Sequence, residues 1–360
     1  MPDEDRTALR GGARQGYLPL LDVIRVVAVA GVVGVHVLAG AEEAGADGTG
    51  LLTVDMALVA AVPAFFMISG ALGLDPRAQR NGAGAFLRRR AARILPALVV
   101  WSALCILVIR VGLLRTPTDL RDVVSMVVTG TTAPHLYFLF ALAGLVLLSP
   151  VIQPFLAPYE GRRAWILGLG ACAWTVAVMA VGRLAEAGVV STVPVELGTG
   201  TFFLVYLGYY VLGRAVLVAP VPRRLAVALL AASPAWVALL VVLYRWAATG
   251  TGGATAAVLS PAYVTAPVMA YSVGLVAAVV SLGRDWRVGE VAARRLRRAG
   301  EATFGVYLVH YPVLVLLREL VPGLNAPTAG ALLGLWALTA AISAVFALLA
   351  MRVPGLRRLV

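Results

Sequence analysis

Apolar runs of about 18 to 24 residues recur along the whole chain, and each is long enough to cross the hydrocarbon core of a bilayer as a helix. The connections between them are too short to fold as a separate soluble domain. The sequence therefore predicts an all-α integral membrane protein, built as a single bundle of about ten transmembrane helices. The expected spans are residues 17–40, 52–74, 94–113, 134–156, 164–182, 200–218, 224–246, 261–283, 301–320 and 328–351.

The charge distribution predicts the topology of this bundle. The chain is 61% apolar and 13% charged, against about 45–50% and about 25% in soluble domains. All thirty basic residues are arginine, and twenty-three of them fall on one side if the spans alternate. By the positive-inside rule that side is the cytoplasm, so residues 1–16 and 353–360 are expected to be cytoplasmic ends of one transmembrane domain, 17–352. The formal charge of +12 then reflects topology, and no nucleic-acid partner is expected.

The first span, residues 17–40, carries three ionisable side chains, Asp22, Arg25 and His36. Such groups cost roughly 2.5–3.5 kcal/mol each at membrane depth and normally face a protein interior or a wet cavity. His36 follows Arg25 by eleven positions, so on a helix the two side chains lie about 20° apart around the axis and about 16 Å apart along it. Asp22 lies about 60° from Arg25. One face of this helix is therefore expected to look inward.

Two interpretations of that face are open. Asp22 and Arg25 alone are explained by an i,i+3 ion pair near the cytoplasmic end, with His36 hydrogen-bonded to a neighbouring carbonyl. The functional interpretation makes His36, Arg25 and Asp22 members of a catalytic site, because histidine is the side chain whose unperturbed pKa suits proton transfer near neutral pH.

An arginine cluster precedes the third span in the stretch FLRRRAARILPALVVW. Arg90 and Arg93 are i,i+3 neighbours, and two guanidinium groups on one helical face suit a phosphate or pyrophosphate. Arg89 belongs to the same cluster, which otherwise serves only to anchor topology and contact anionic lipid. Ser69, in FFMISG of the second span, is a small residue that lets a helix or a cofactor arm approach closely.

The other candidate site residues lie in later spans and loops. His310 follows Tyr307 by one helical turn, and both are expected to face inward. His135 stands beside Tyr137 at the predicted outer interface, a usual position for an amphipathic anchor. Glu196 lies in an outer loop and completes the acceptor-side candidates. Cys105 and Cys172 fall within apolar spans, so neither a disulfide framework nor a metal site is expected.

An ordered set of motifs runs through nearly the whole chain: LDVIRVVAVAGVVGVH, PAFFMISG, RRRAARILP, HLYFL, FFLVYLGYYVLG and FGVYLVHYPV. Together they resemble the membrane-bound acyltransferase 3 family, bacterial O-acyltransferases that modify cell-surface glycans and, in some members, antibiotics. The chain departs from the common pattern at Val62 and Pro63, where many members read Gly-Val-Asp before the paired phenylalanines.

The resemblance implies a multi-pass protein of the bacterial cytoplasmic membrane that takes an acyl group, usually acetyl, from acetyl-CoA or another acyl-CoA on the cytoplasmic side. The acceptor would be a hydroxyl of a glycan, a lipid-linked sugar or a small molecule on the far side. It further implies that His36 is catalytic, that Arg25 is required with it, and that Arg90 and Arg93 engage the donor. His36 then acts either as a general base or as a carrier of the acyl group.

A second class of function uses the same residues. A proton-coupled transporter or flippase would employ Asp22, Arg25 and His36 as a relay. The two classes differ in one observable, because an acyltransferase consumes the thioester of acetyl-CoA and a transporter leaves it intact. The sequence gives no indication of the oligomeric state.

Overall fold

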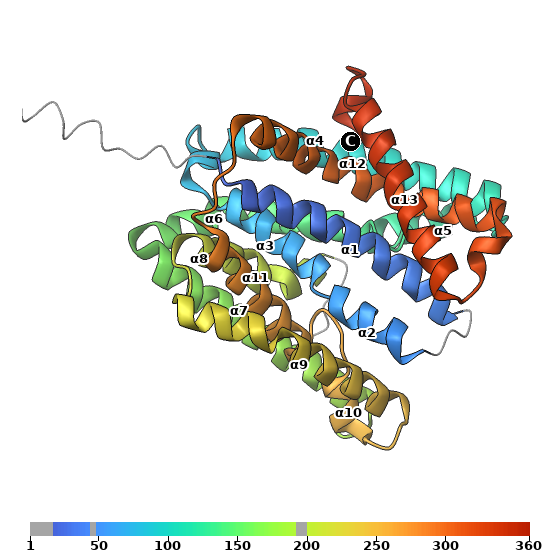
Figure 1. Cartoon of the computed structure of the whole chain (residues 1–360), viewed down its shortest axis with the longest axis horizontal. Helices are drawn as coiled ribbons and strands as arrows, with labels where there is room; N and C mark the ends of the chain where they lie inside the picture. Colours follow the sequence, from blue (N-terminus) through green and yellow to red (C-terminus); the bar gives the residue numbers. More distant parts are fainter. Residues whose placement is uncertain (1–16, 44–47, 192–199) are drawn as a thin grey trace, which may run out of the picture.

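A computed structural model describes residues 17–43, 48–191 and 200–360, and in these ranges every regular element is a helix (Figure 1). The longer helices are α1 (Pro19–Glu43), α2 (Thr49–Leu58), α3 (Ala61–Gly73), α4 (Ala83–Leu104), α5 (Leu120–Thr129), α6 (Tyr137–Leu156), α7 (Glu160–Glu186), α8 (Leu207–Val218), α9 (Arg223–Ala248), α10 (Gly253–Leu259), α11 (Ala266–Gly283), α12 (Glu290–Leu320) and α13 (Ala329–Ala350). The all-α prediction is confirmed for the described residues.

Eight helical stretches in the described part of the chain are long and apolar enough to span a membrane. One of them, Tyr137–Glu186, contains two helices, because Tyr159 leaves the helical conformation (φ −143°, ψ 56°) between α6 and α7. The expected span 200–218 corresponds to a shorter apolar helix, Phe202–Val218. The protein is therefore a multi-pass membrane protein, and the total of ten spans and the cytoplasmic location of the termini stay predictions.

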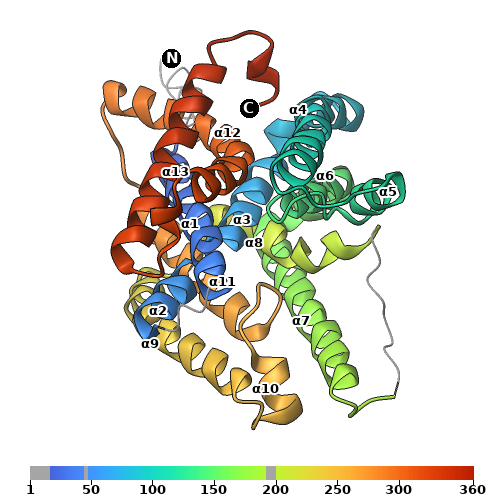
Figure 2. The same ribbon diagram turned by 90° about the vertical axis from the view of Figure 1, so that its right-hand side faces the viewer.

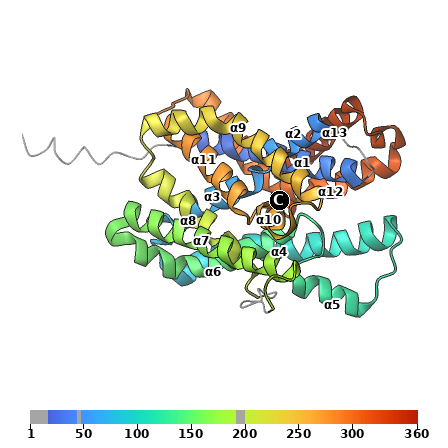
Figure 3. The same ribbon diagram turned by 90° about the horizontal axis from the view of Figure 1, so that it is seen from below.

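Helix α1 lies in the middle of the molecule, where it packs against α3, α12 and α13 (Figures 1 and 2). Seen from below, α4 to α7 form one half, α1, α2, α9 and α11 to α13 form the other, and α3 with α8 lies between them (Figure 3). Ile24, Val29 and Val32 of α1 are buried, whereas Val27 is 65% exposed. The predicted inward face of the first span thus points into the protein, and its opposite face is free for lipid.

The crossing of α3 and α8 depends on two glycines. A Cβ atom on Gly70 would lie 1.7 Å from the carbonyl oxygen of Tyr210, and one on Gly213 would lie 1.7 Å from that of Met67. No side chain fits at such distances, so the two backbones touch through small residues, as is common between membrane helices. Of the two small residues in FFMISG, Gly70 therefore serves helix packing.

A buried ion-pair network joins the ends of three helices on the arginine-rich side. Arg214 of α8 donates from Nε to Glu160 Oε1 (2.6 Å) and from Nη1 to Asp75 Oδ2 (3.1 Å). Its side chain is only 8% exposed. Arg214 lies inside α8 and within the expected span 200–218, where the two carboxylates neutralise its charge.

Two helices begin well before their apolar spans. Helix α4 begins at Ala83 and α12 at Glu290, where the expected spans begin at residues 94 and 301. Each extension adds about 16 Å of helix on the arginine-rich side. Alanine, leucine and arginine are strong helix formers, so a polar, arginine-rich stretch continues the apolar helix rather than ending it. As a result Pro96 lies inside α4.

The segment after α13, residues 351–360, folds back onto these two extended helices. The indole Nε1 of Trp101 in α4 donates a hydrogen bond to the carbonyl oxygen of Leu359 (3.0 Å). Val360 is buried in the main core and packs at Gly305 of α12. This terminal segment is therefore part of the folded structure.

Candidate active site

Three histidines meet in the core: His36 of α1, His310 of α12 and His135 of the turn before α6. The ring centroid of His36 lies 5.3 Å from that of His310 and 6.4 Å from that of His135, and the latter two rings are 5.0 Å apart. His310 is fully buried and His135 is 2% exposed, so His135 is not an interface anchor. Tyr311 contacts both His36 and His135, with ring centroids 5.6 and 5.3 Å away.

Backbone carbonyls fix the orientation of two of these rings. His310 Nδ1 lies 2.6 Å from the carbonyl oxygen of Tyr307, and His135 Nε2 lies 3.2 Å from that of Leu308. A carbonyl only accepts, so each of these nitrogens carries the proton. The remaining nitrogens, His310 Nε2 and His135 Nδ1, are buried without a hydrogen-bond partner among the described residues. Two unpaired imidazole nitrogens therefore lie in the immediate surroundings of His36.

His36 lines a cavity of about 290 Å³, which we call the histidine cavity. Its wall includes His135 and the aromatic side chains of Phe65, Phe138 and Tyr307. Tyr307 donates its hydroxyl hydrogen to the carbonyl oxygen of His135 (2.6 Å), which fixes this wall. The cavity is a largely apolar chamber with two imidazoles on its wall, and neither is paired with a described carboxylate.

A second, narrower cavity of about 150 Å³ lies next to the first, and we call it the middle cavity. The two share Phe65, Phe138 and Tyr307 in their walls, so they are separated only by aromatic side chains. The middle cavity is lined by four of the polar residues singled out in the sequence, namely Arg25, Ser69, Arg90 and Arg93. Arg25 and His36, about 16 Å apart along α1, thus face two adjoining cavities.

Asp22 contributes to the middle cavity indirectly, through its contact with Arg25. Its Oδ1 accepts a hydrogen bond from Arg25 Nη1 (2.9 Å) and its Oδ2 accepts one from the Tyr17 hydroxyl (2.8 Å). Burial and the hydrogen bond to Asp22 raise the pKa of Tyr17 to about 12, so this hydroxyl keeps its proton at neutral pH. The i,i+3 ion pair is present, and Asp22 packs against Gly300 of α12. Asp22 therefore holds Arg25 in place.

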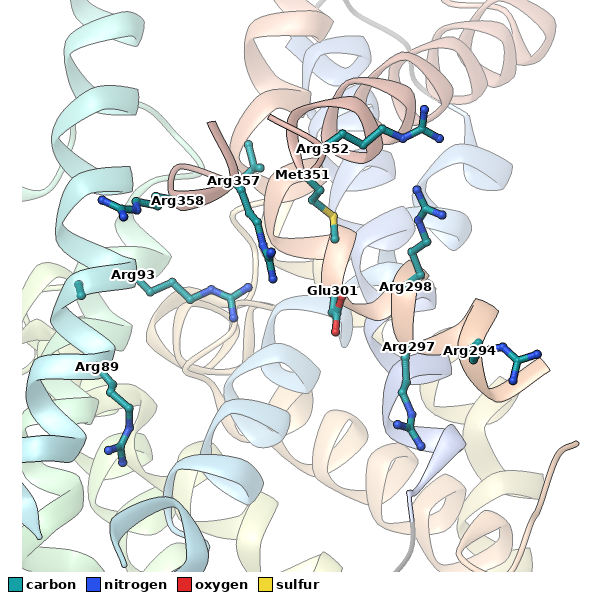
Figure 4. Close-up of a pocket in the computed structure, with 12 residues that line it drawn as sticks. Arg89, Arg93, Arg294, Arg297, Arg298, Glu301, Met351, Arg352, Arg357 and Arg358 are labelled. Atoms are coloured by element: carbon teal, nitrogen blue, oxygen red, sulfur yellow. The ribbon is translucent and has the colours of Figure 1, made fainter. Parts of the chain in front are cut away.

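The third cavity, the arginine cavity, opens at the ends of α4 and α12 and has a volume of about 720 Å³ (Figure 4). It adjoins the middle cavity, since Arg93 and Glu301 line both. Eight arginines and one glutamate form its charged lining: Arg89, Arg93, Arg294, Arg297, Arg298, Arg352, Arg357, Arg358 and Glu301. The formal net charge of these side chains is +7, and a concave site with this charge attracts polyanions.

A fourth cavity, the outer cavity, lies on the far side of the histidine cavity and has a volume of about 450 Å³. The two share Pro134 and Tyr137. Its wall carries Arg110 and several hydroxyl groups, from Thr116, Thr131, Thr132, Tyr137 and Tyr311. The four cavities thus follow one another from the arginine-rich ends of α4 and α12, past His36, to a polar chamber on the other side.

Of the sequence-predicted residues, His36, His135 and Tyr307 line the histidine cavity, and His310 packs against the His36 ring. The middle cavity is lined by Arg25, Ser69, Arg90 and Arg93. Arg89 lies in the arginine cavity, with one Nη donating to the Ala78 carbonyl (2.8 Å). Glu196 lies outside the described residues. Within those residues, no group of three or more His, Cys, Asp or Glu side chains is arranged to hold a metal ion.

Sequence reasoning missed two kinds of residue. Phe65 and Phe138, which separate the middle cavity from the histidine cavity, stood inside the motifs PAFFMISG and HLYFL but were not singled out. The arginines of α12 and of the segment 351–360 were assigned to topology alone. Their alignment with Arg93 depends on long-range packing, for which the sequence held no signal beyond the clustering of charge.

A comparison with protein families gave a match over most of the chain. A protein-family model described as an acyltransferase domain, that of the acyltransferase 3 family, matches residues 18–351. No curated protein and no solved structure gave a match. The matched region contains all of α1 to α13, and it includes the lining of all four cavities apart from Arg352, Arg357, Arg358 and Val360. The family match supports an acyltransferase activity and gives no support to the transporter interpretation. The chain belongs to the acyltransferase 3 family.

Proposed function

We propose that this protein transfers an acyl group, acetyl in the simplest case, from a cytoplasmic acyl-CoA to a hydroxyl group on the opposite side of the bacterial cytoplasmic membrane. The observation that carries the proposal is the row of adjoining cavities that leads from a strongly cationic mouth to a buried imidazole. An acyl-CoA has the matching chemistry, with phosphate groups at one end, a long neutral arm, and a thioester at the other end.

The donor would bind with its phosphates against guanidinium groups and its pantetheine arm in the middle cavity. Arg90 and Arg93 lie on one face of α4 and line the middle cavity, where a pyrophosphate and the start of the arm would meet them. Arg25 stands on the same wall, held by Asp22. The thioester would then reach the histidine cavity past Phe65 and Phe138.

At the thioester, His36 would act on the acceptor hydroxyl. Its imidazole takes the hydroxyl proton while the oxygen attacks the carbonyl carbon, and the carbon–sulfur bond breaks as the tetrahedral intermediate collapses. The proton then passes to the departing thiolate, which restores neutral His36 and releases free coenzyme A. The buried, unpaired Nε2 of His310 beside this ring supports a positioning role for His310.

The acceptor would enter through the outer cavity. Hydroxyl-bearing side chains and the guanidinium of Arg110 line this chamber, and such groups hydrogen-bond sugars well. The outer cavity reaches the histidine cavity at Pro134 and Tyr137. A glycan, a lipid-linked sugar or another hydroxylated molecule on the far side of the membrane is therefore the proposed acceptor class.

The test is thioester consumption by purified protein in lipid nanodiscs. Acetyl-CoA labelled in the acetyl group should lose its label to an acceptor or to water, with one free thiol released for each acetyl group. Arg90→Ala with Arg93→Ala should weaken acetyl-CoA binding, and more so at low salt, because charge-assisted contacts near a surface are screened. The matched control is Arg223→Ala with Arg224→Ala, an exposed pair that lines none of the four cavities. If folded wild-type protein left the acetyl-CoA thioester intact, this result would contradict the proposal.

A further inference from the structure

We infer that the segment 351–360 is a wall of the donor site and that Arg357 and Arg358 recognise the 3′-phosphate of coenzyme A. The inference rests on the proposed function and extends it to a part of the chain for which the sequence suggested only a cytoplasmic tail. In Figure 4, the side chains of Arg93 of α4 and Arg357 of this segment converge, and Glu301 of α12 lies beside them.

The first argument is the order of the cavities. Arg93 lines both the middle cavity and the arginine cavity, so it marks their junction. In coenzyme A the pyrophosphate follows directly on the pantetheine arm, and the ribose 3′-phosphate lies beyond it. With the arm in the middle cavity, the pyrophosphate falls at Arg93, and the 3′-phosphate falls among the other arginines of the arginine cavity, which include Arg357 and Arg358.

The second argument is that the charge of this cavity is not balanced by the described protein. Among its eight arginines, only Arg294 has a described carboxylate within ion-pair distance, Glu290 at 3.6 Å. Arginine presents several donors in a planar fork that fits phosphate oxygens, and a guanidinium without a carboxylate partner keeps these donors available. The volume of about 720 Å³ lies within the usual range for a site that holds a nucleotide-sized ligand.

The third argument is that the segment is held in place before any ligand binds. Leu359, next to Arg358, accepts the hydrogen bond from Trp101, and Val360 is buried against α12 at Gly305. An arginine whose backbone is fixed loses less conformational freedom when it binds than one on a free tail. Arg357 and Arg358 are therefore preorganised for a ligand in the arginine cavity.

A cluster of phosphate-binding arginines also suits the headgroup of an anionic lipid, which shares the same chemistry. The two ligands are distinguished by testing whether the arginines bind the 3′-phosphate of coenzyme A or the phosphate of a lipid. We propose measuring the affinity of coenzyme A and of 3′-dephospho-coenzyme A for full-length protein in phosphatidylcholine nanodiscs. Wild type should bind coenzyme A about tenfold more tightly, the effect of one charge-assisted phosphate contact.

The informative variant is Arg357→Ala with Arg358→Ala. It should lose about tenfold in affinity for coenzyme A and almost nothing for 3′-dephospho-coenzyme A, so that the discrimination between the two disappears. Arg223→Ala with Arg224→Ala, another adjacent exposed pair, should keep the discrimination. Adenosine 3′,5′-bisphosphate should compete with acetyl-CoA in wild type and compete less in the variant.

Discrimination that is equal in the variant and in wild type would overturn the inference while leaving the proposed function intact. A second set of nanodiscs, with phosphatidylglycerol in place of phosphatidylcholine, tests for lipid binding. If the arginines hold a lipid headgroup instead, phosphatidylglycerol should weaken coenzyme A binding in wild type but not in the variant, which also overturns the inference. Failure of wild-type protein to bind any form of coenzyme A would contradict the proposed function itself.

Discussion

Replacing Gly300 by alanine is expected to disturb the donor site through Asp22. A Cβ atom on Gly300 would lie 2.3 Å from Asp22 Oδ1 and 2.6 Å from its Cγ. Since non-bonded heavy atoms prefer separations of about 3.5 Å or more, the carboxylate must retreat by about 1 Å. The hydrogen bond from Arg25 Nη1 to Asp22 Oδ1 is now 2.9 Å long, and such a retreat stretches it beyond hydrogen-bond distance.

The size of the effect follows from that lost contact. A hydrogen bond between charged groups contributes about 1.5–3 kcal/mol, and the lower end applies here because the Arg25 side chain is 28% exposed. An Arg25 side chain freed from Asp22 must be ordered again when the donor binds, so acetyl-CoA affinity should fall about tenfold. The overpacking itself should lower the free energy of unfolding by only about 1–3 kcal/mol, since a side chain and not a helix has to move.

Acetyl-CoA binding and the thermal unfolding midpoint should be measured on the same nanodisc preparations. Gly170→Ala is the matched control, because a Cβ atom on Gly170 in α7 meets nothing within 4 Å. This control should keep its donor affinity and gain slightly in stability from the higher helix propensity of alanine. Unchanged donor affinity in folded Gly300→Ala protein would refute the view that Asp22 positions Arg25 for the donor.

Three further variants test other parts of the structure. Arg214→Ala leaves the carboxylates of Asp75 and Glu160 facing each other and should reduce the free energy of unfolding by about 3 kcal/mol; an unchanged thermal midpoint would show that this network is not stabilising. Arg110→Ala should raise the KM for the acceptor without changing acetyl-CoA affinity, and the reverse pattern would remove the outer cavity from the acceptor path. Glu301→Gln should tighten acetyl-CoA binding about twofold at low salt and less at high salt, whereas weaker binding would contradict the electrostatic argument.

Helical periodicity predicted the parts of the site that lie on one helix. The inward face of α1 was expected from the spacing of Arg25 and His36, and these residues do line adjoining cavities. Arg90 and Arg93, one turn apart, line the middle cavity together. Both results follow from the geometry of a single regular helix, which is set by local hydrogen bonds and does not depend on the rest of the fold.

The contacts between helices could not be predicted in the same way. The hydrogen bond between His135 and the Leu308 carbonyl joins residues 173 positions apart, and that between Trp101 and Leu359 joins residues 258 positions apart. Helix packing brings these pairs together, and the periodicity of one helix contains no information about its neighbour. For this reason His135 was expected at an interface although it is buried beside His36.

The boundaries of α4 and α12 show a second limit of sequence reasoning. The arginines before each apolar span were assigned to the cytoplasmic boundary because charge is costly in lipid. The position of charged residues predicts where a helix leaves the bilayer but not where it ends, since arginine favours the helical conformation about as much as leucine does. Both helices therefore continue about 16 Å further than expected, and these extensions form the walls of the arginine cavity.

The central claim is that His36 performs the chemistry, and the most direct test compares binding with turnover in His36→Ala. Loss of a general base should reduce acyl transfer by roughly 10²–10⁴-fold while acetyl-CoA still binds through Arg90 and Arg93. His36 lines a cavity and forms no ion pair with a described carboxylate, so its removal should leave the amount of folded protein and the thermal midpoint nearly unchanged. Equal specific activity per folded molecule in His36→Ala and wild type would contradict the account.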